Sequence, residues 1–241
     1  MMLAGKIAFV SGGTGYIGTE ICRTLARYGA QVIFSYHGNE EKAGALVKEL
    51  NGARAVQLNF RDAKQITGTI ETLYKEINHI DILVNNAAVS QVMPFAMLEE
   101  EDVDLAIDIN MKGPIFLTKA VVRGMIRNKS GVIVSMGSIA GERVLAVPIM
   151  YAMTKASISG FTYALAPELK KFGIRVNSVV PGLLDGGVAQ GVPGDLKTEF
   201  MKHCAAGRPG TAQEVAEVVA FLASDKASYI NGQAIHVNGG I

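Results

Sequence analysis

The stretch KIAFVSGGTGYIG, residues 6–18, decides the fold of this chain. Its first five residues, Lys6–Val10, form a short apolar run that predicts a buried β-strand. A glycine-rich turn follows, and Ile17, Ile21 and Leu25 then recur at the spacing of one helix face. Glycine lets the backbone turn sharply, and the free N–H groups at a helix N-terminus attract phosphate. The stretch therefore predicts a strand–loop–helix unit that binds the pyrophosphate of a dinucleotide cofactor.

Several residues of this loop are candidate contacts of the cofactor, namely Gly12, Thr14, Gly15, Tyr16 and Ile17. A glycine pattern alone is weak support, because many turns between a strand and a helix are rich in glycine. The alternative interpretation is such an ordinary turn. The position of the pattern, directly between the first strand and the first helix, favours the cofactor loop.

Short apolar runs alternate with segments of helical spacing over the rest of the chain. The runs predict six more strands, at residues 31–36, 53–59, 80–84, 132–135, 175–180 and 233–237. Helical spacing covers residues 66–77, 97–127 with a break near Gly113–Pro114, 151–171, and 211–223. Such alternation implies right-handed βαβ units. We therefore predict an α/β fold: a Rossmann-type, doubly wound, seven-stranded parallel sheet with helices on both faces, in one domain over residues 1–241.

Composition narrows the class of protein further. The chain has 241 residues, of which 49% are hydrophobic, so it can bury a full core. Its 23 Lys and Arg residues against 22 Asp and Glu give a net charge of +1, which argues against nucleic acid or a membrane surface as partner. No apolar run of about 18 residues predicts a transmembrane helix. Cys22 and Cys204 form no motif, so we expect no metal site, no disulfide framework and a cytoplasmic location.

The end of the second predicted strand is the place that reads the adenosine ribose. A carboxylate there favours NAD, but this chain has none before Glu40. The absence favours NADP, and the side chains of Ser35, His37 and Asn39 could bind its 2′-phosphate. No Arg or Lys stands in this stretch, so NAD is not excluded. A solvated loop histidine is the alternative interpretation of His37.

Tyr151 and Lys155 are four residues apart, which places them on one face of the predicted helix. Ser138 follows a predicted buried strand, and Asn110 lies on a preceding helix. Reduction of a carbonyl needs a proton donor and a group that polarises the oxygen. Tyr151 could supply the proton, Ser138 could bind the oxygen, and the charge of Lys155 could lower the pKa of the tyrosine. Asn110 could hold a water molecule that connects Lys155 to solvent.

In this order and spacing, the motifs resemble those of the short-chain dehydrogenases/reductases, and most closely the bacterial 3-oxoacyl-[acyl-carrier-protein] reductases. The resemblance covers the whole chain. It rests on the glycine loop, the sequence NNAA at residues 85–88, the four residues just described, Pro181-Gly182, and the ending of the chain from Phe221 to Gly240.

The resemblance implies roles for particular residues. Asn110, Ser138, Tyr151 and Lys155 would form the catalytic tetrad, and Lys155 would also hold the nicotinamide ribose. The remaining implied contacts with cofactor run from the adenine to the nicotinamide: Asn59, Phe60, Asn86, Ala87, Pro181, Gly182 and Leu184. The family assembles mostly as homotetramers.

Several positions depart from the family pattern. Tyr16 stands where the loop usually has its middle glycine, and Gly15 stands where many NADP-dependent members have arginine. Ala88 replaces a glycine of the fourth motif. Gly186 and Gly187 occupy the region where a threonine usually binds the carboxamide. These departures suggest a specialised relative.

The function that the resemblance implies is NADPH-dependent reduction of a β-keto group on an acyl chain bound to acyl carrier protein or CoA, with Tyr151 as general acid. One alternative is an NAD-dependent dehydrogenase of a small cyclic or steroid-like alcohol. Another is a catalytically retired cofactor-binding protein.

Residues 181–194 are rich in glycine and proline, which predicts a flexible lid over about residues 182–202. Arg123, Arg127 and Lys129 could dock an acidic carrier protein, or could be ordinary surface charge.

Overall fold

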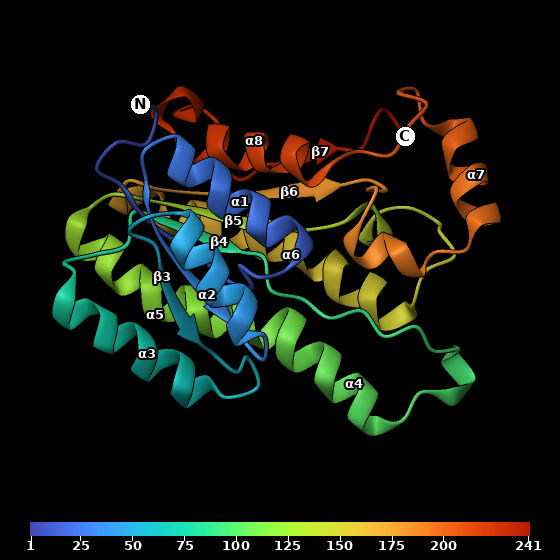
Figure 1. Ribbon diagram of the computed structural model, residues 1–241, viewed down its shortest axis with the longest axis horizontal. Coiled ribbons are helices and arrows are strands. Elements are labelled where there is room, and N and C mark those ends of the chain that lie inside the picture. Colours follow the sequence, from blue (N-terminus) through green and yellow to red (C-terminus); the bar gives the residue numbers. More distant parts are fainter.

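The computed structural model describes residues 1–241 and is built around one seven-stranded sheet (Figure 1). The strands are β1 (Ile7–Val10), β2 (Gln31–Tyr36), β3 (Arg54–Gln57), β4 (Ile82–Asn85), β5 (Gly131–Met136), β6 (Ile174–Pro181) and β7 (Ala234–Val237). They lie in the order β3-β2-β1-β4-β5-β6-β7, and every neighbouring pair is parallel. This confirms the predicted fold. The strand order reverses between β1 and β4, where sheets of this kind bind their ligands.

Helices cover both faces of the sheet. One face packs against α1 (Tyr16–Arg27), α2 (Glu40–Glu49) and α8 (Ala212–Ala223). The other face packs against α3 (Ala63–Glu76), α5 (Gly113–Asn128) and α6 (Ile149–Leu169). Neighbouring residues of one strand serve opposite faces, since Phe9 belongs to the second core and Val10 to the first. None of the helices has both the length and the apolar composition that crossing a membrane requires.

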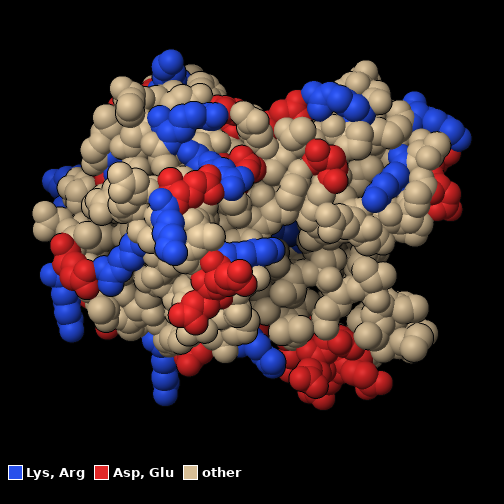
Figure 2. All heavy atoms as spheres, viewed as in Figure 1, with Lys and Arg blue, Asp and Glu red and all other residues tan.

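Two further helices stand away from the sheet. They are α4 (Glu100–Ile107), whose first turn is acidic, and α7 (Gly194–His203), in the segment predicted as a lid. Figure 1 shows both at the end of the molecule where the strands point. Figure 2 shows a hollow in this face between the body of the molecule and the arm that α7 forms. The hollow lies where the site is expected.

The structure corrects the predicted break near Gly113–Pro114. The chain forms a π-helical turn over Asp108–Lys112, and α5 begins directly after it. Pro114 lies in the first turn of α5, directly after the π-helical turn. Gly113 packs on Phe60, because a Cβ atom there would lie 2.3 Å from the Phe60 Cδ1 atom. The irregularity therefore comes one turn before the proline.

Helices α2 and α7 were not predicted from the sequence. Helix α2 buries only Ala43 and Leu46, so its periodic signal is weak. Its start is fixed by Asn39, whose side-chain oxygen accepts a hydrogen bond from the Lys42 N–H at 2.9 Å. Helix α7 buries no residue, and its apolar side chains Leu196 and Phe200 line the second cavity instead of packing in the core.

Candidate functional site

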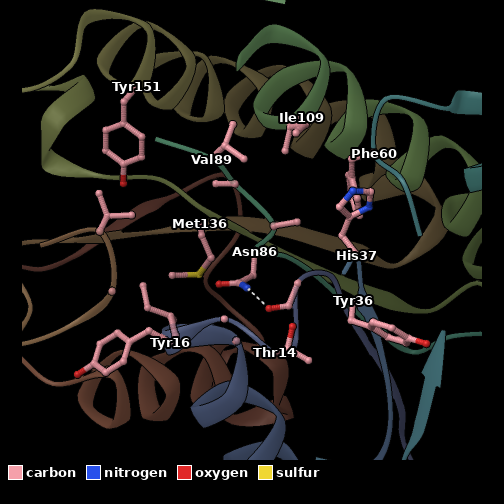
Figure 3. A pocket seen from close by; sticks show the side chains of 18 of the residues that line it. Thr14, Tyr16, Tyr36, His37, Phe60, Asn86, Val89, Ile109, Met136 and Tyr151 are labelled. Carbon is pink, nitrogen blue, oxygen red and sulfur yellow. Dashed lines mark hydrogen bonds between the residues drawn. The ribbon is translucent and has the colours of Figure 1, made fainter. Parts of the chain in front are cut away.

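Two adjoining cavities open where the carboxyl ends of the strands meet. The first has a volume of about 710 Å³ and runs from the end of β2 past the glycine loop to Tyr151 on α6 (Figure 3). The second has a volume of about 360 Å³ and is lined mainly by apolar side chains. Ser138 and Tyr151 line both cavities. The geometry therefore places two hydroxyl groups where a ligand of one cavity would meet a ligand of the other.

The glycine loop forms the floor of the first cavity. A Cβ atom at Gly18 would lie 2.1 Å from the carbonyl oxygen of Gly12, so only glycine allows this close approach. The Asn86 side chain donates hydrogen bonds to the carbonyl oxygens of Ser11 and Gly12 at 2.9 and 3.1 Å. Helix α1 starts after Gly15 without a side-chain cap, which leaves the N–H groups of its first turn free. These features fit the pyrophosphate of a nicotinamide dinucleotide.

The predicted loop contacts all line this cavity: Gly12, Thr14, Gly15, Tyr16 and Ile17. So do His37, Asn59, Phe60, Asn86, Ala87, Pro181 and Leu184. Gly182 lies instead in the wall of the second cavity. The lining includes further residues that the sequence analysis did not single out: Tyr36, Gly38, Leu58, Arg61, Val89, Leu105, Ile109, Met136, Gly137, Val188 and Ala189. Tyr36 and Met136 end a strand, and Leu58 and Gly137 directly follow one, so the carboxyl end of a strand was the available signal for these four.

Ser35 does not face the cavity, which corrects its assignment as a phosphate contact. It is only 1% exposed, and its hydroxyl accepts a hydrogen bond from the Gly12 N–H at 3.1 Å. Its carbonyl oxygen accepts another from the Gly13 N–H at 2.8 Å. Ser35 therefore shapes the glycine loop from behind.

Arg61 supplies the cation that the second strand lacks. Strands β2 and β3 are neighbours, so the residues after β3 lie beside those after β2. His37 and Phe60, the residue before Arg61, both line the first cavity (Figure 3). Arg61 lines the same end of the cavity and forms an ion pair with Asp108, with the Arg61 Nε atom 3.5 Å from the carboxylate. This end of the cavity thus holds a guanidinium that is paired with the Asp108 carboxylate, and it holds no carboxylate from β2.

Tyr151 and Ser138 form the polar centre of the site. Ser138 follows β5, and its side-chain oxygen accepts a hydrogen bond from the Ala140 N–H at 3.1 Å. Burial raises the pKa of Tyr151 above its usual value, and a hydrogen bond with the Ser138 side chain opposes this rise. This corrects the expectation that Lys155 lowers the pKa of the tyrosine. In the protein without cofactor, desolvation is the larger effect, and Tyr151 remains protonated at neutral pH.

Lys155 is buried directly beneath the tyrosine. Its ammonium donates a hydrogen bond to the Met136 carbonyl oxygen at 2.7 Å and lies 5.8 Å from the centre of the Tyr151 ring. No carboxylate neutralises it, so burial lowers the pKa of Lys155 to about 8. At neutral pH the Lys155 side chain is therefore mostly protonated and positively charged, but its pKa lies close enough to neutral pH for the ammonium to lose its proton readily.

Asn110 lies in the π-helical turn and points inward. Its side chain donates to the Val89 carbonyl oxygen at 2.9 Å and accepts from the Val89 N–H at 2.8 Å. It also donates to the Thr154 hydroxyl at 3.0 Å, next to Lys155 in α6. Because both ends of the amide are engaged, Asn110 fixes the wall of the cavity and the position of α6. Its role in holding a water molecule stays a prediction.

Three basic residues lie at the opposite end of the sheet from Tyr151 and Ser138: Arg123, Arg127 and Lys129. Arg123 and Arg127 are in the second half of α5, and they border a small cavity beside Tyr74 of α3. Helix α5 leads into the start of β5, so its C-terminal half lies toward the amino ends of the strands. The cavities open at the carboxyl ends. These basic residues therefore do not line the two cavities, and docking of a carrier protein at them stays a prediction.

Comparison with known proteins agrees with this geometry. Residues 14–241 match the family described as enoyl-(acyl carrier protein) reductase. The chain is 36% identical to the 3-oxoacyl-[acyl-carrier-protein] reductase FabG of Escherichia coli, over 100% of this chain and 99% of the relative.

Solved structures give the same result. A short-chain dehydrogenase/reductase from Serratia marcescens matches with a TM-score of 0.92 and 31% identity, over 100% of this chain and 99% of that one. A gluconate 5-dehydrogenase from Burkholderia cenocepacia, in complex with NADP and tartrate, matches with a TM-score of 0.92 and 28% identity, over 99% of this chain and 95% of that one. The chain belongs to the short-chain dehydrogenase/reductase family, and it is an oxidoreductase that uses a nicotinamide cofactor.

Proposed function

We propose that the protein reduces the β-keto group of an acyl thioester, carried on acyl carrier protein or CoA, with NADPH as the reductant. The observation that carries this proposal is the position of Ser138 and Tyr151. Both residues lie where the first cavity, whose floor is the glycine loop, meets the second cavity, which is lined mainly by apolar side chains. The relatives named as 3-oxoacyl-[acyl-carrier-protein] reductases support the same substrate class.

The residues of the chain perform distinct parts of the reaction. A nicotinamide cofactor held in the first cavity would supply the hydride for the carbonyl carbon. The Ser138 hydroxyl donates a hydrogen bond to the carbonyl oxygen as negative charge develops there. Tyr151 transfers its proton to that oxygen, which completes the hydroxyl group. The charge of Lys155 stabilises the tyrosinate that remains, until a proton from solvent restores the tyrosine.

Tyr151 is protonated at neutral pH, as the proton donor of a reduction must be, because the ordinary pKa of tyrosine lies well above 7 and burial raises it further. The raised pKa also makes the tyrosine a weaker acid, so transfer of its proton depends on the charge of Lys155, which stabilises the tyrosinate as it forms. The reverse reaction, oxidation of an alcohol, requires the tyrosinate.

The second cavity indicates the rest of the substrate. Leu145, Val147, Leu196 and Phe200 contribute to its apolar wall, which suits an acyl chain. The same wall also supports the alternative of a small cyclic or steroid-like alcohol. The family description names reduction of a carbon–carbon double bond. The two hydroxyl groups of Ser138 and Tyr151 at the junction of the cavities favour reduction of a carbonyl instead.

Initial rates with acetoacetyl-CoA, measured with NADPH and with NADH, test the proposal. We expect clear oxidation of NADPH and slower oxidation of NADH. Oxidation of cyclic alcohols with NAD, in the absence of ketone reduction, would favour the alternative substrate class. Binding of cofactor without turnover of any substrate would favour a retired enzyme.

Arg61 provides a test of the preference for NADPH. Replacing it by alanine is expected to raise the KM for NADPH about 5–20-fold, because one charged contact with the 2′-phosphate is lost. The KM for NADH is expected to change by less than about twofold, because NADH has no such phosphate. Arg54→Ala is the control, since Arg54 pairs with Glu76 on the surface and does not line the cavity. Equal changes for the two cofactors would contradict a phosphate contact.

A further inference from the structure

Two departures from the family pattern touch each other across the mouth of the first cavity. Tyr16 is the first residue of α1, and its hydroxyl donates a hydrogen bond to the carboxylate of Asp185. The Tyr16 ring lies on the backbone of the two glycines that follow Asp185. A Cβ atom at Gly186 would lie 2.6 Å from the Tyr16 Cε2 atom, and one at Gly187 would lie 3.0 Å from Cδ1. The three residues Tyr16, Gly186 and Gly187 also line the cavity.

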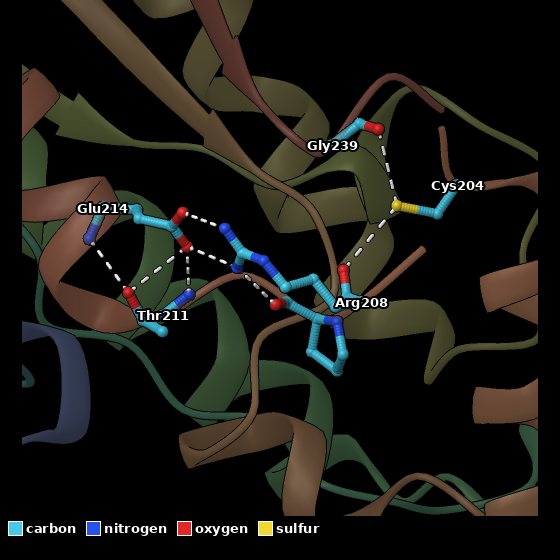
Figure 4. A network of polar contacts seen from close by, with 6 residues as sticks. Cys204, Arg208, Thr211, Glu214 and Gly239 are labelled. Atoms are coloured by element: carbon cyan, nitrogen blue, oxygen red, sulfur yellow. Dashed lines mark hydrogen bonds and ion pairs between the residues drawn. The ribbon is translucent and has the colours of Figure 1, made fainter. Parts of the chain in front are cut away.

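The segment that Tyr16 contacts is fixed at both of its ends. After β6 the chain pairs with Gly210, whose carbonyl oxygen accepts a hydrogen bond from the Asp185 N–H at 2.9 Å. Beyond α7, the Cys204 thiol lies 3.5 Å from the Gly239 carbonyl oxygen. Figure 4 shows this contact beside the ion pair between Arg208 and Glu214. Residues 186–203 therefore form a closed loop between two anchors, and Tyr16 meets this loop directly after the first anchor.

The contact joins the two parts of the molecule between which a cofactor would lie. On one side is the N-terminus of α1, whose free N–H groups suit the pyrophosphate. On the other side is the loop after β6, which borders the end of the cavity near Tyr151. In Figure 3 the Tyr16 ring lies at the edge of the cavity, across from Tyr151. A cofactor that left sideways would have to pass this bridge.

We infer that Tyr16 is a positioning residue that latches residues 186–203 over the bound nicotinamide cofactor and slows its release. The ring and the hydroxyl have separate parts. The ring requires glycine at residues 186 and 187, because any larger side chain would occupy its space. The hydroxyl adds the hydrogen bond to Asp185. The tyrosine and the two glycines thus form one matched set.

This inference rests on the proposed cofactor binding, so its test separates the two. The dissociation rate of NADPH is measured by stopped-flow fluorescence, and hydrogen exchange of residues 186–192 is measured without cofactor. Tyr16→Phe and Asp185→Asn are each expected to speed dissociation about 3–10-fold, because one hydrogen bond is lost or weakened. Tyr16→Ala is expected to have a larger effect and to speed hydrogen exchange of the loop in the free protein.

Tyr28→Phe is the matched control. Tyr28 follows the other end of α1, and its hydroxyl donates to the Glu217 carboxylate at 2.8 Å, so the variant loses the same kind of bond far from the cavity. We expect its dissociation rate to stay within about twofold of the wild type. An equal effect of Tyr28→Phe and Tyr16→Phe would overturn the latch.

A double-mutant cycle tests the match between ring and glycine. Gly186→Ala alone is expected to speed NADPH dissociation, because the new methyl group displaces the ring. In the Tyr16→Ala background the same change is expected to have little further effect, since the ring atoms that it would meet are gone. Additive effects, or normal exchange of the loop in Tyr16→Ala, would overturn the inference. A wild-type protein that binds neither NADPH nor NADH would instead refute the cofactor proposal on which the latch depends.

Discussion

Replacing Tyr151 by phenylalanine is expected to lower kcat for acetoacetyl-CoA reduction by about 10²–10⁴-fold, the range that general acids contribute. The substitution removes only the hydroxyl that lies at the junction of the two cavities. Because the ring remains, the dissociation constant of NADPH is expected to change by less than about twofold. Fluorescence titration of NADPH and initial rates measure these two quantities.

The control is Tyr163→Phe, which makes the same change on the same helix at a tyrosine that is 53% exposed. It is expected to retain full activity. If Tyr151→Phe also retained most of its activity, the proton would come from another group. A large loss of cofactor affinity in Tyr151→Phe would show instead that the hydroxyl serves binding.

Replacing Lys155 by methionine is expected to impair the enzyme while making the fold more stable. The variant loses the positive charge that stabilises the tyrosinate, so kcat/KM is expected to fall by about 10²–10⁴-fold. Burial without a carboxylate lowers the pKa of Lys155 from 10.5 to about 8, which means that folding the charged form is costly. Methionine fills similar space without charge. The free energy of unfolding at pH 7 is expected to rise by about 1–3 kcal/mol, after allowance for the lost hydrogen bond to Met136.

The sign of the pH dependence follows from the same pKa. The unfolded chain binds the Lys155 proton more tightly than the folded protein does, so the wild type gains stability as pH rises from about 8 to 10.5. The difference in the free energy of unfolding between Lys155→Met and wild type therefore has its full value below about pH 8, and it becomes smaller above that pH. Thermal unfolding of both proteins across this range measures it. Lys170→Met is the control, because Lys170 is an exposed lysine at the end of α6. A methionine variant that is less stable than wild type at pH 7 would contradict the argument.

The fold was predictable because its signals are local. The strand–loop–helix stretch at residues 6–18 and the apolar runs need only their own periodicity to be read. Sequence spacing does not show which strands are neighbours in the sheet, and the strand order of the structure supplies this information. Arg61 was missed because its relevance depends on β3 lying beside β2. Ser35 was misplaced because the turn of the glycine loop, rather than the sequence, decides which face of β2 meets the cavity.

The details of the site depend on contacts between distant segments. Tyr16 and Gly186 were each recognised as departures from a pattern, but nothing local shows that the ring of one needs the missing side chain of the other. The pKa of Tyr151 was predicted to be lowered, from its spacing to Lys155. Spacing places the two residues on one helix face but does not show how deeply the surrounding strands bury them.

The π-helical turn at Asp108–Lys112 has a consequence for how this chain can change over evolution. An α-helix advances by about 100° per residue, and a π-helical turn accommodates one residue more than an α-helical turn does. Losing a single residue between α4 and α5 would restore a regular helix, yet it would rotate one helix against the other and swing Asn110 away from Val89 and Thr154. Substitutions can be tolerated at many positions of this turn as long as Asn110 is kept. The number of residues in it is therefore constrained more tightly than the identity of most of them.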